Sequence, residues 1–315
     1  MPLTDYLNAF QRLRTDSGAA KYPASTLHRA PHKPMLLLSV LDLAARGELS
    51  TNFVPLSIDL GTLFADYWKL VMPTDRRGNL AYPFFYLKSD DFWHLVPQQG
   101  KEEALAAIRQ IAGMGQLRET IVGAQLDAEL HMLVCIAETR EQLRNALIEK
   151  YFHPDYHEVL SQQAAINLGA FQYSEALLHQ PRSGSTVSAA EPSDDKSSVR
   201  DQGFRRAIVT AYNHRCVLCG LRLVTTEGQT IANAAHIIPW SVSHNDDPRN
   251  GLCLCGTCHT VFDLGLAGIT ERYRVTLSRQ ISLSGNIAGH LSTLDTRPIF
   301  EPTEAVYNPE VNALQ

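Results

Sequence analysis

The sequence lacks any apolar run of the length that a membrane span requires, which is about 18 residues or more. Its longest candidate, PMLLLSVLDLAA at residues 34–45, contains Asp42 and predicts a buried helix of a globular domain. The first ten residues, MPLTDYLNAF, also lack the apolar segment of a secretory signal peptide. These absences predict a cytoplasmic protein that has no membrane partner.

A strong excess of one charge is missing as well. The net charge is −5 over 315 residues, which by itself argues against a nucleic-acid partner. Basic residues do cluster locally, at Arg76–Arg77 and at Arg205–Arg206. Local fields govern nucleic-acid binding more than the total charge does, so composition leaves the partner open.

Internal repeats are absent, and a chain of 315 residues predicts two domains. Residues 181–199, PRSGSTVSAAEPSDDKSSV, are rich in Ser, Pro and Asp and poor in large apolar side chains, which is typical of a linker. We therefore predict an N-terminal domain over residues 1–175, a flexible linker over 176–199 and a C-terminal domain with its tail over 200–315.

Apolar spacing predicts an α+β protein whose N-terminal domain is mainly helical with a small β element. The expected helices of this domain cover residues 35–49, 60–71, 101–113 and 138–152. The aromatic segment YPFFYLKSDDFWHLV, residues 82–96, alternates and predicts a pair of strands around Ser89 to Asp91.

The C-terminal domain has a different predicted order. A short helix, a cysteine turn and a strand are followed by a loop that runs into a second helix, and then by a final strand. These elements are expected over residues 204–212, 216–220, 228–240, 247–266 and 273–278.

Six cysteines are present, and five of them lie between residues 216 and 258. In a reducing compartment this clustering favours a metal site over disulfides. The CxxC pairs Cys216/Cys219 and Cys255/Cys258 together supply the four thiolates of a closed, structural zinc site. A redox pair and a plain apolar turn are the alternatives, and the thioredoxin-like context that a redox pair needs is absent.

The two other cysteines are predicted to be core residues. Cys253 stands on an apolar rhythm between Leu252 and Leu254, and Cys135 stands in a helical pattern. Unpaired cysteine behaves as a small apolar side chain, so burial is expected at both positions.

His259 directly follows Cys258, and Asp263 comes one helical turn later on the same face. The nitrogen and oxygen donors of this pair suit a harder divalent ion than the zinc ion that four thiolates bind. The alternative is an ordinary helix-terminal histidine and a surface aspartate with no metal. His236 lies on an apolar strand and Asn250 in a predicted turn. Each of these two residues also has a purely structural interpretation.

The segments CVLCG, AAHIIPW and DDPRNGLCLCGTCHTVFD combine these residues in one order, and residues 204–279 resemble the HNH nucleases of the ββα-metal type. The resemblance implies phosphodiester hydrolysis with His236 as general base and one Mg²⁺ or Mn²⁺ ion held by His259 and Asp263. Asn250 would shape the loop or help to hold the ion.

The sequence departs from this family at Ala235, where many members have a metal-binding Asp or His, so the ion would depend on the helix residues and water. Phosphate contacts are a further expectation in this domain, against the alternative of solvated surface residues. The candidates are Arg205, Arg206, His214 and Arg215.

The segments RAPHKPMLLLSVLDL, GNLAYPFFYLKSDDFWHL and LRNALIEKYF make residues 5–160 resemble the sulfur-binding domain of phosphorothioate-dependent HNH restriction endonucleases. Tyr82 and Pro83 would then form an apolar cup for the sulfur, although both residues can equally serve the core or shape a strand start. Neighbouring phosphates would be held by Arg29, His32 and Lys33, and a guanine edge would be read by Arg76 or Arg77. His32 and Lys33 can also be a solvated helix entry before Pro34.

Together the two resemblances imply a restriction enzyme of host defence that binds double-stranded, phosphorothioate-modified DNA and cuts nearby. Cutting two strands from one-metal sites predicts a possible homodimer. Two alternatives stay open, which are a methylcytosine-dependent HNH endonuclease and a non-catalytic, zinc-containing DNA-binding module.

Overall fold

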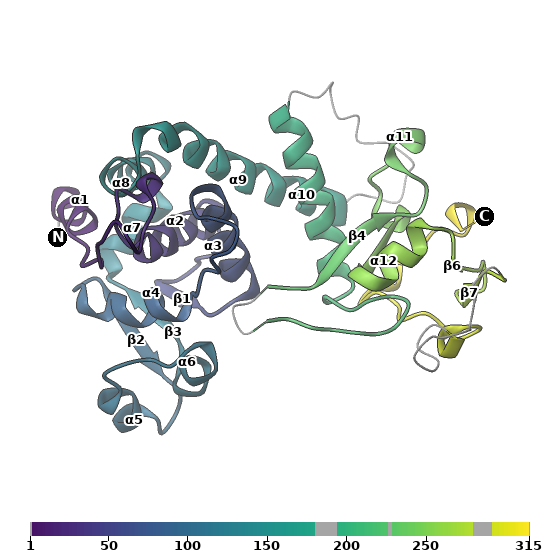
Figure 1. The fold of residues 1–315 in the computed structure, drawn as a ribbon, viewed down its shortest axis with the longest axis horizontal. Coiled ribbons are helices and arrows are strands. Elements are labelled where there is room, and N and C mark those ends of the chain that lie inside the picture. Colours follow the sequence, from purple (N-terminus) through teal and green to yellow (C-terminus); the bar gives the residue numbers. More distant parts are fainter. Residues whose placement is uncertain (1, 180–193, 226–228, 280–291, 315) are drawn as a thin grey trace. The chain divides into compact units, whose positions relative to one another are not determined.

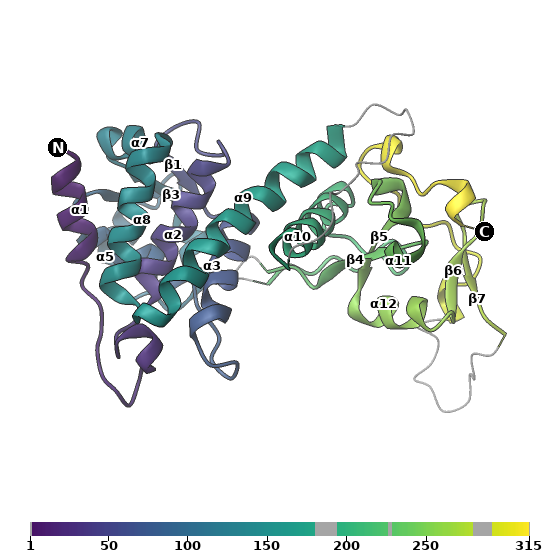
Figure 2. The ribbon, with the colours of Figure 1, turned by 90° about the horizontal axis from the view of Figure 1, so that it is seen from above.

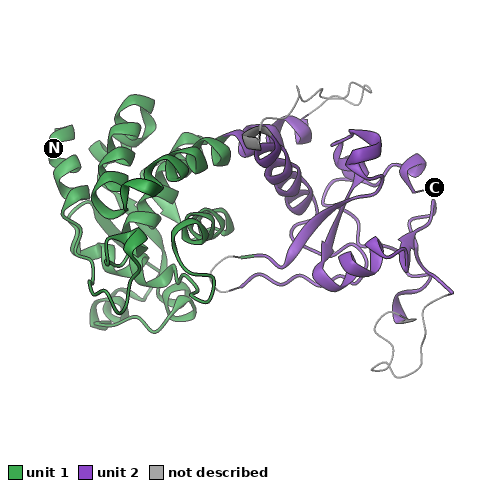
Figure 3. Ribbon diagram, turned by 45° about the horizontal axis from the view of Figure 1, so that its top comes forward, with its two compact units in different colours: residues 1–168, 226–229 green, residues 169–225, 230–315 purple. Residues whose placement is uncertain are grey.

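The computed structural model describes residues 2–179, 194–225, 229–279 and 292–314. It divides into unit 1, residues 1–168 and 226–229, and unit 2, residues 169–225 and 230–315, which are coloured separately in Figure 3. Most of the predicted linker, residues 180–193, lies outside the described residues. The ends of the predicted linker belong to the helices α9 (His157–His179) and α10 (Asp194–Ala211).

Unit 1 is mainly helical (Figure 1). Its helices are α1 (Leu3–Gln11), α2 (His32–Ala45), α3 (Ile58–Val71), α4 (Ala81–Tyr86), α5 (Glu102–Ala107), α6 (Met114–Thr120), α7 (Ala128–Cys135), α8 (Ala137–Tyr151) and the start of α9. Every side chain of α2 from Lys33 to Ala44 is buried, which confirms the buried helix predicted from the apolar run. No helix in the described part of the chain has the length and hydropathy needed to cross a membrane.

The β element of unit 1 is a three-stranded antiparallel sheet in the order β1-β3-β2. The strands are β1 (Phe53–Pro55), β2 (Trp93–Pro97) and β3 (Ile121–Leu126). Ala124 at the centre of β3 pairs with Val54 on one side and with Leu95 on the other, and it is fully buried. The sheet therefore contributes to the same core as the helices.

The prediction of a strand at residues 82–86 was wrong, because this segment is the helix α4. Phe84 and Phe85 are adjacent and both are fully buried, which an alternating strand with one solvated face does not allow. Pro83 lies in the first turn of α4, where its missing N–H costs no hydrogen bond. Only the second half of the predicted strand pair is confirmed, as β2.

A buried polar network joins four helices of unit 1 around Asp42, the residue that interrupts the long apolar run. One oxygen of Asp42 accepts hydrogen bonds from Tyr67 Oη at 2.9 Å and from Asn167 Nδ2 at 2.7 Å. The other oxygen lies 2.9 Å from Arg144 Nη1, and both side chains of this ion pair are only 2% exposed. The four residues come from α2, α3, α8 and α9, so one carboxylate ties these helices together.

Unit 2 is built around an antiparallel strand pair, β4 (Ala232–His236) and β5 (Gly251–Cys255), which leads directly into α12 (Gly256–Asp263). The helix α10 packs on the pair, and α11 (Trp240–Ser243) lies in the connection between the strands (Figures 1 and 2). A second pair, β6 (Ala267–Ile269) and β7 (Val275–Leu277), follows α12.

Residues 251–255 form a strand, whereas the sequence predicts a loop there. All five residues of β5 are buried, so the strand is covered on both faces and shows no polar alternation. Its hydrogen-bonded partner β4 is 15 or more residues away in the sequence, from His236 paired with Gly251 to Ala232 paired with Cys255. A pattern of neighbouring residues therefore cannot predict the pairing that makes this segment a strand.

The predictions for the two other cysteines have opposite outcomes. Cys253 is fully buried on β5, as expected. Cys135 is exposed, so its assignment to the core was wrong. It is the last residue of α7, and its Sγ lies 3.5 Å from Nε2 of His131 one turn earlier.

Replacing Arg144 by Ala is expected to lower the free energy of unfolding of unit 1 by about 3–5 kcal/mol, because the Asp42 carboxylate would remain buried without its ion-pair partner. Chemical denaturation of the purified variant measures this loss. Lys69→Ala is the matched control, since Lys69 forms an exposed ion pair with Asp66 and is expected to change stability by no more than about 1 kcal/mol. Equal effects of the two substitutions would contradict a structural role of the network.

Candidate functional site

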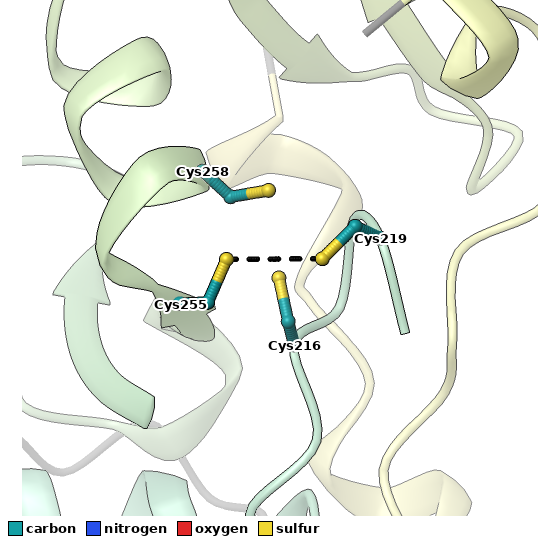
Figure 4. Close-up of side chains that lie close together, drawn as sticks. All are labelled: Cys216, Cys219, Cys255 and Cys258. Carbon is teal, nitrogen blue, oxygen red and sulfur yellow. Dashed lines mark hydrogen bonds between the residues drawn. The ribbon is translucent and has the colours of Figure 1, made fainter. Parts of the chain in front are cut away.

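Four cysteines converge at the junction of β5 and α12 (Figure 4). Cys216 and Cys219 come from the turn after α10, Cys255 ends β5 and Cys258 lies in the first turn of α12. Their Sγ atoms all lie within 4.8 Å of one another, and three of the four residues are buried. The predicted pairing of the two CxxC segments is therefore present in the fold.

The spacing of the sulfur atoms fits a tetrahedral metal ion. Metal–sulfur bonds of about 2.3 Å place the sulfurs of a regular tetrahedron about 3.8 Å apart. The Sγ atoms of Cys219 and Cys255 are 3.7 Å apart. Hydrogen bonds among these thiols lower the pKa of Cys216 and raise the pKa of Cys219 and Cys258, so without a metal ion the cluster favours a single thiolate, at Cys216.

The turn that carries the first two cysteines depends on Gly220. Its φ of +76° lies in the left-handed region, and an added Cβ would lie 2.5 Å from the ring of Phe300. Within the turn, Gly220 N donates to Cys216 O at 2.9 Å and Cys216 N donates to Leu221 O at 2.9 Å. Glycine thus allows the chain to turn back so that both thiols point to one place.

His236 is the last residue of β4 and is held on two sides. Its ring stacks on Phe204 of α10, with centroids 3.8 Å apart and planes 4° from parallel. Its Nε2 lies 2.7 Å from Oδ1 of Asp246, whose side chain is 6% exposed. Among the described residues Nδ1 has no hydrogen-bond partner, so this nitrogen remains available to take a proton. Asp246 was not singled out from the sequence, because the motif DDPRN does not show which carboxylate reaches the histidine.

Asn250 shapes the loop between β4 and β5. Its Oδ1 accepts a hydrogen bond from Ile238 N at 2.9 Å, and its Nδ2 donates to Ile238 O at 3.1 Å and to Asn245 O at 3.0 Å. The residue is 1% exposed, and these bonds occupy its amide. Of the two roles considered for Asn250, this geometry supports loop shaping rather than metal binding.

His259 and Asp263 lie on one face of α12, as their spacing predicts. His259 Nε2 is 3.5 Å from Asp263 Oδ2, and the side chains are 26% and 62% exposed. Both can point ligand atoms at one ion with open positions for water or phosphate. Within the described chain, however, the four cysteines are the only group of three or more potential metal ligands. The His236–Asp246 and His259–Asp263 pairs therefore stand as two separate pairs.

The basic residues proposed as phosphate contacts in unit 2 make contacts within the domain. Arg205 donates to Asn233 Oδ1 at 2.9 Å and to Ala232 O at 3.1 Å, which attaches α10 to β4. Arg215 Nη1 donates to Gly220 O at 3.2 Å, beside the cysteine cluster. Arg206 lies over the ring of Phe171, and His214 is half-buried with a left-handed backbone. Their phosphate role stays a prediction.

Two of the predicted DNA-binding residues of unit 1, His32 and Lys33, form the start of α2. The ring of His32 packs against Trp68 of α3 with centroids 4.7 Å apart, and burial lowers the pKa of His32 to about 4. His32 is therefore neutral at physiological pH and offers a hydrogen bond rather than a charge. Lys33 is buried and its Nζ lies 2.6 Å from Oδ2 of Asp90, so its charge is already paired.

The three arginine candidates of unit 1, Arg29, Arg76 and Arg77, lie on exposed loops. Arg29 is exposed directly after Leu27 and His28, which both have positive φ. Arg77 is exposed in the loop between α3 and α4, whereas Arg76 donates a hydrogen bond to Lys21 O and accepts one from Trp68 Nε1 through its carbonyl. Trp68 thus contacts both His32 and this loop, and it places the two candidate regions next to each other.

Tyr82 and Pro83 occupy neighbouring positions on α4, where side chains diverge by about 100°. Tyr82 is 39% exposed, whereas Pro83 is buried. A hydrogen bond from Ala81 N to Asn79 Oδ1 at 2.9 Å holds the entry of this helix. Tyr82 therefore presents an aromatic surface to solvent, and Pro83 supports the helix beneath it.

Comparison with known families finds a match in each half of the chain, in agreement with the two resemblances noted in the sequence. Residues 5–166 match the family model "ScoMcrA-like, DNA sulfur-binding domain", and residues 216–270 match the model "HNH endonuclease". No curated protein matches the chain. A solved structure titled "Modification dependent TagI restriction endonuclease" is 21% identical over 40% of this chain and 42% of that chain, with a TM-score of 0.28. The match spans less than half of that protein's length.

Substituting Cys219 by Ala is expected to remove the bound metal from the protein, because three thiolates no longer enclose a tetrahedral ion. Elemental analysis of the purified full-length chain measures this as a fall from about one ion per chain, together with a lower melting temperature. Cys135→Ala is the matched control, since this cysteine is exposed and outside the cluster. Unchanged metal content in the Cys219 variant would show that the cluster does not hold an ion.

Proposed function

This chain belongs, over residues 5–166 and thus just over half of its 315 residues, to the ScoMcrA-like DNA sulfur-binding domain family, and from this membership we propose that it is a phosphorothioate-dependent DNA endonuclease. The observation that carries the proposal is the presence of an HNH endonuclease domain in the same chain. Unit 1 would bind modified double-stranded DNA, and unit 2 would hydrolyse phosphodiester bonds nearby as a defence against foreign DNA.

Sulfur recognition requires a surface whose binding free energy becomes more favourable when it contacts a large, polarizable and weakly hydrated atom. A phosphorothioate sulfur loses less hydration than a phosphate oxygen when it is buried against apolar groups, so an apolar contact discriminates between them. The exposed ring of Tyr82, supported by Pro83, is the proposed contact. The neutral His32 and the exposed Arg29 and Arg77 are the proposed partners of the flanking phosphates and bases.

Two features of unit 1 support this assignment. The N-terminus of α2 presents backbone N–H groups, which favour an anionic group nearby. The Lys33–Asp90 ion pair fixes the first turn of that helix, so Lys33 would position the site without contacting DNA itself.

In unit 2 the proposed general base is His236. Asp246 accepts a hydrogen bond from Nε2, which leaves the lone pair of Nδ1 to take a proton from the attacking water. Stacking on Phe204 and the loop held by Asn250 restrict the orientation of the ring. These contacts leave Nδ1 without a hydrogen-bond partner among the described residues.

Two metal ions of different character fit the donor atoms. The four thiolates suit zinc, which would clamp the turn after α10 to the start of α12. The nitrogen and oxygen donors of His259 and Asp263 suit Mg²⁺ or Mn²⁺ with water completing the shell. When bound, such an ion stabilises negative charge that develops on the scissile phosphate.

The full-length His236→Ala variant is expected to bind a duplex with one phosphorothioate at least about tenfold more tightly than the same duplex without sulfur, a difference of about 1.4 kcal/mol. Fluorescence anisotropy with a pool of flanking sequences measures it, for each stereoisomer separately. Tyr82→Ala should abolish the preference but keep the weaker binding of unmodified DNA, whereas Val122→Ala, at another exposed apolar side chain, should keep both. A preference for a methylated duplex instead would reassign unit 1 to methylcytosine.

His236→Ala is also expected to lower the cleavage rate of the bound duplex by about 10²–10⁴-fold, because the general base is removed. Cleavage is followed on denaturing gels with Mg²⁺ or Mn²⁺, at DNA concentrations that saturate binding. His179→Ala is the control, since this histidine is largely exposed at the end of α9. Wild-type cleavage by the His236 variant would refute the catalytic assignment, and absence of cleavage by every form would favour a DNA-binding module.

A further inference from the structure

Asp246 has two hydrogen-bonded neighbours, one on each carboxylate oxygen. Oδ1 lies 2.7 Å from Nε2 of His236, and Oδ2 accepts a hydrogen bond from Oη of Tyr173 on α9 at 2.8 Å. We propose that Tyr173 and Asp246 act together as positioning residues that set which nitrogen of His236 carries the proton. The proposal depends on His236 being the base of the proposed nuclease reaction.

The loop that carries Asp246 is held rigidly on both sides of the residue. Asn250 Nδ2 donates to Asn245 O at 3.0 Å, and Asp247 N donates to Asn245 Oδ1 at 2.9 Å. Asp247 in turn pairs with Arg249 at 2.6 Å. With its backbone fixed in this way, Asp246 can place each oxygen against a different partner.

In the described part of the chain, few charged and titratable groups surround this carboxylate. Arg200 of α10 has Nε 4.0 Å from Oδ2 of Asp246, and its guanidinium also lies over the ring of Trp240 and contacts Asp201. Phe204 covers one face of His236. Burial raises the pKa of Tyr173 above its ordinary value, so its hydroxyl remains a donor across the working pH range.

The donors and acceptors determine the tautomer. An ionised carboxylate only accepts hydrogen bonds, and the Tyr173 hydroxyl donates to one of its oxygens. Nε2 of His236 must therefore carry the proton that faces Asp246, and the lone pair is on Nδ1. When water is activated, one O–H bond breaks and an Nδ1–H bond forms. The resulting imidazolium is stabilised by the Asp246 charge. The electron pair of the water oxygen forms a bond to phosphorus, while the bond from phosphorus to the leaving 3′ oxygen breaks. That oxygen leaves with the bonding electron pair and then takes a proton from solvent.

This arrangement makes an unusual prediction for Asp246→Asn. The asparagine oxygen would be held by the Tyr173 hydroxyl, so its NH₂ group would face His236. The imidazole would then have to accept at Nε2 and carry its proton on Nδ1, which removes the base. If Tyr173 is also changed to Phe, the amide is free to turn its oxygen toward His236, and the productive tautomer becomes accessible again.

Single-turnover cleavage of a saturating duplex by the full-length protein tests this. Asp246→Asn is expected to slow cleavage by about 10²–10⁴-fold, and Tyr173→Phe alone by less than about tenfold. The Asp246→Asn/Tyr173→Phe double variant is expected to recover at least about tenfold over Asp246→Asn, since a productive general base is worth far more than that. Asp246→Asn/Tyr307→Phe should not recover, because the Tyr307 hydroxyl donates to Leu178 O instead.

The pH–rate profile supplies a second readout that a purely structural role would not change. Tyr173→Phe leaves Asp246 with more negative charge toward His236, which favours the protonated form of the imidazole. The acidic limb of the profile should therefore move to higher pH.

The outcomes separate the two proposals. Suppose that His236→Ala is inactive, that the double variant cleaves no faster than Asp246→Asn, and that the pH–rate profile of Tyr173→Phe is unchanged. The positioning role of Tyr173 and Asp246 is then refuted, and the nuclease assignment stands. If His236→Ala cleaves like the wild type, His236 is not the base, and the proposed positioning role of Tyr173 and Asp246 is refuted as well. Melting temperatures and DNA binding of each variant confirm that losses of cleavage are not losses of fold.

Discussion

The contact between four cysteine sulfurs is the constraint on which unit 2 depends. Cys255 ends a strand and Cys258 lies in the first turn of the next helix, so one ion that binds both fixes the angle between β5 and α12. Cys216 and Cys219 bring the turn after α10 to the same place. The cluster therefore holds the framework that carries His236 on one side and His259 on the other.

In both units a buried carboxylate connects elements that are far apart in the sequence. Asp42 joins four helices of unit 1 through Tyr67, Asn167 and Arg144. Asp246 joins α9 to the end of β4 through Tyr173 and His236. A buried charge is costly unless it is hydrogen-bonded and paired, so each carboxylate requires its partners to stay in place. In unit 1 this requirement stabilises the core, and in unit 2 it orients the ring of His236.

The residues predicted to contact DNA differ in what their side chains face. Arg205 and Lys33 were considered as phosphate contacts, yet one binds the backbone and side chain of β4 and the other pairs with Asp90. Tyr82 and Arg29 keep exposed side chains. Long cationic side chains serve equally well as internal braces and as DNA contacts, and only their surroundings distinguish the two uses.

Much of this protein was determined by the sequence alone. The cysteine pairs, the one-turn spacing of His259 and Asp263 and the buried helix α2 follow from residue type and local period, and these act over a few residues. Four features were decided only by the tertiary structure: the helix at residues 82–86, the strand at 251–255, the exposure of Cys135, and the choice of Asp246 and Tyr173 as partners around His236. Each of these depends on groups brought together by packing, and Tyr173 and Asp246 are 73 residues apart, a separation over which no local pattern predicts a hydrogen bond.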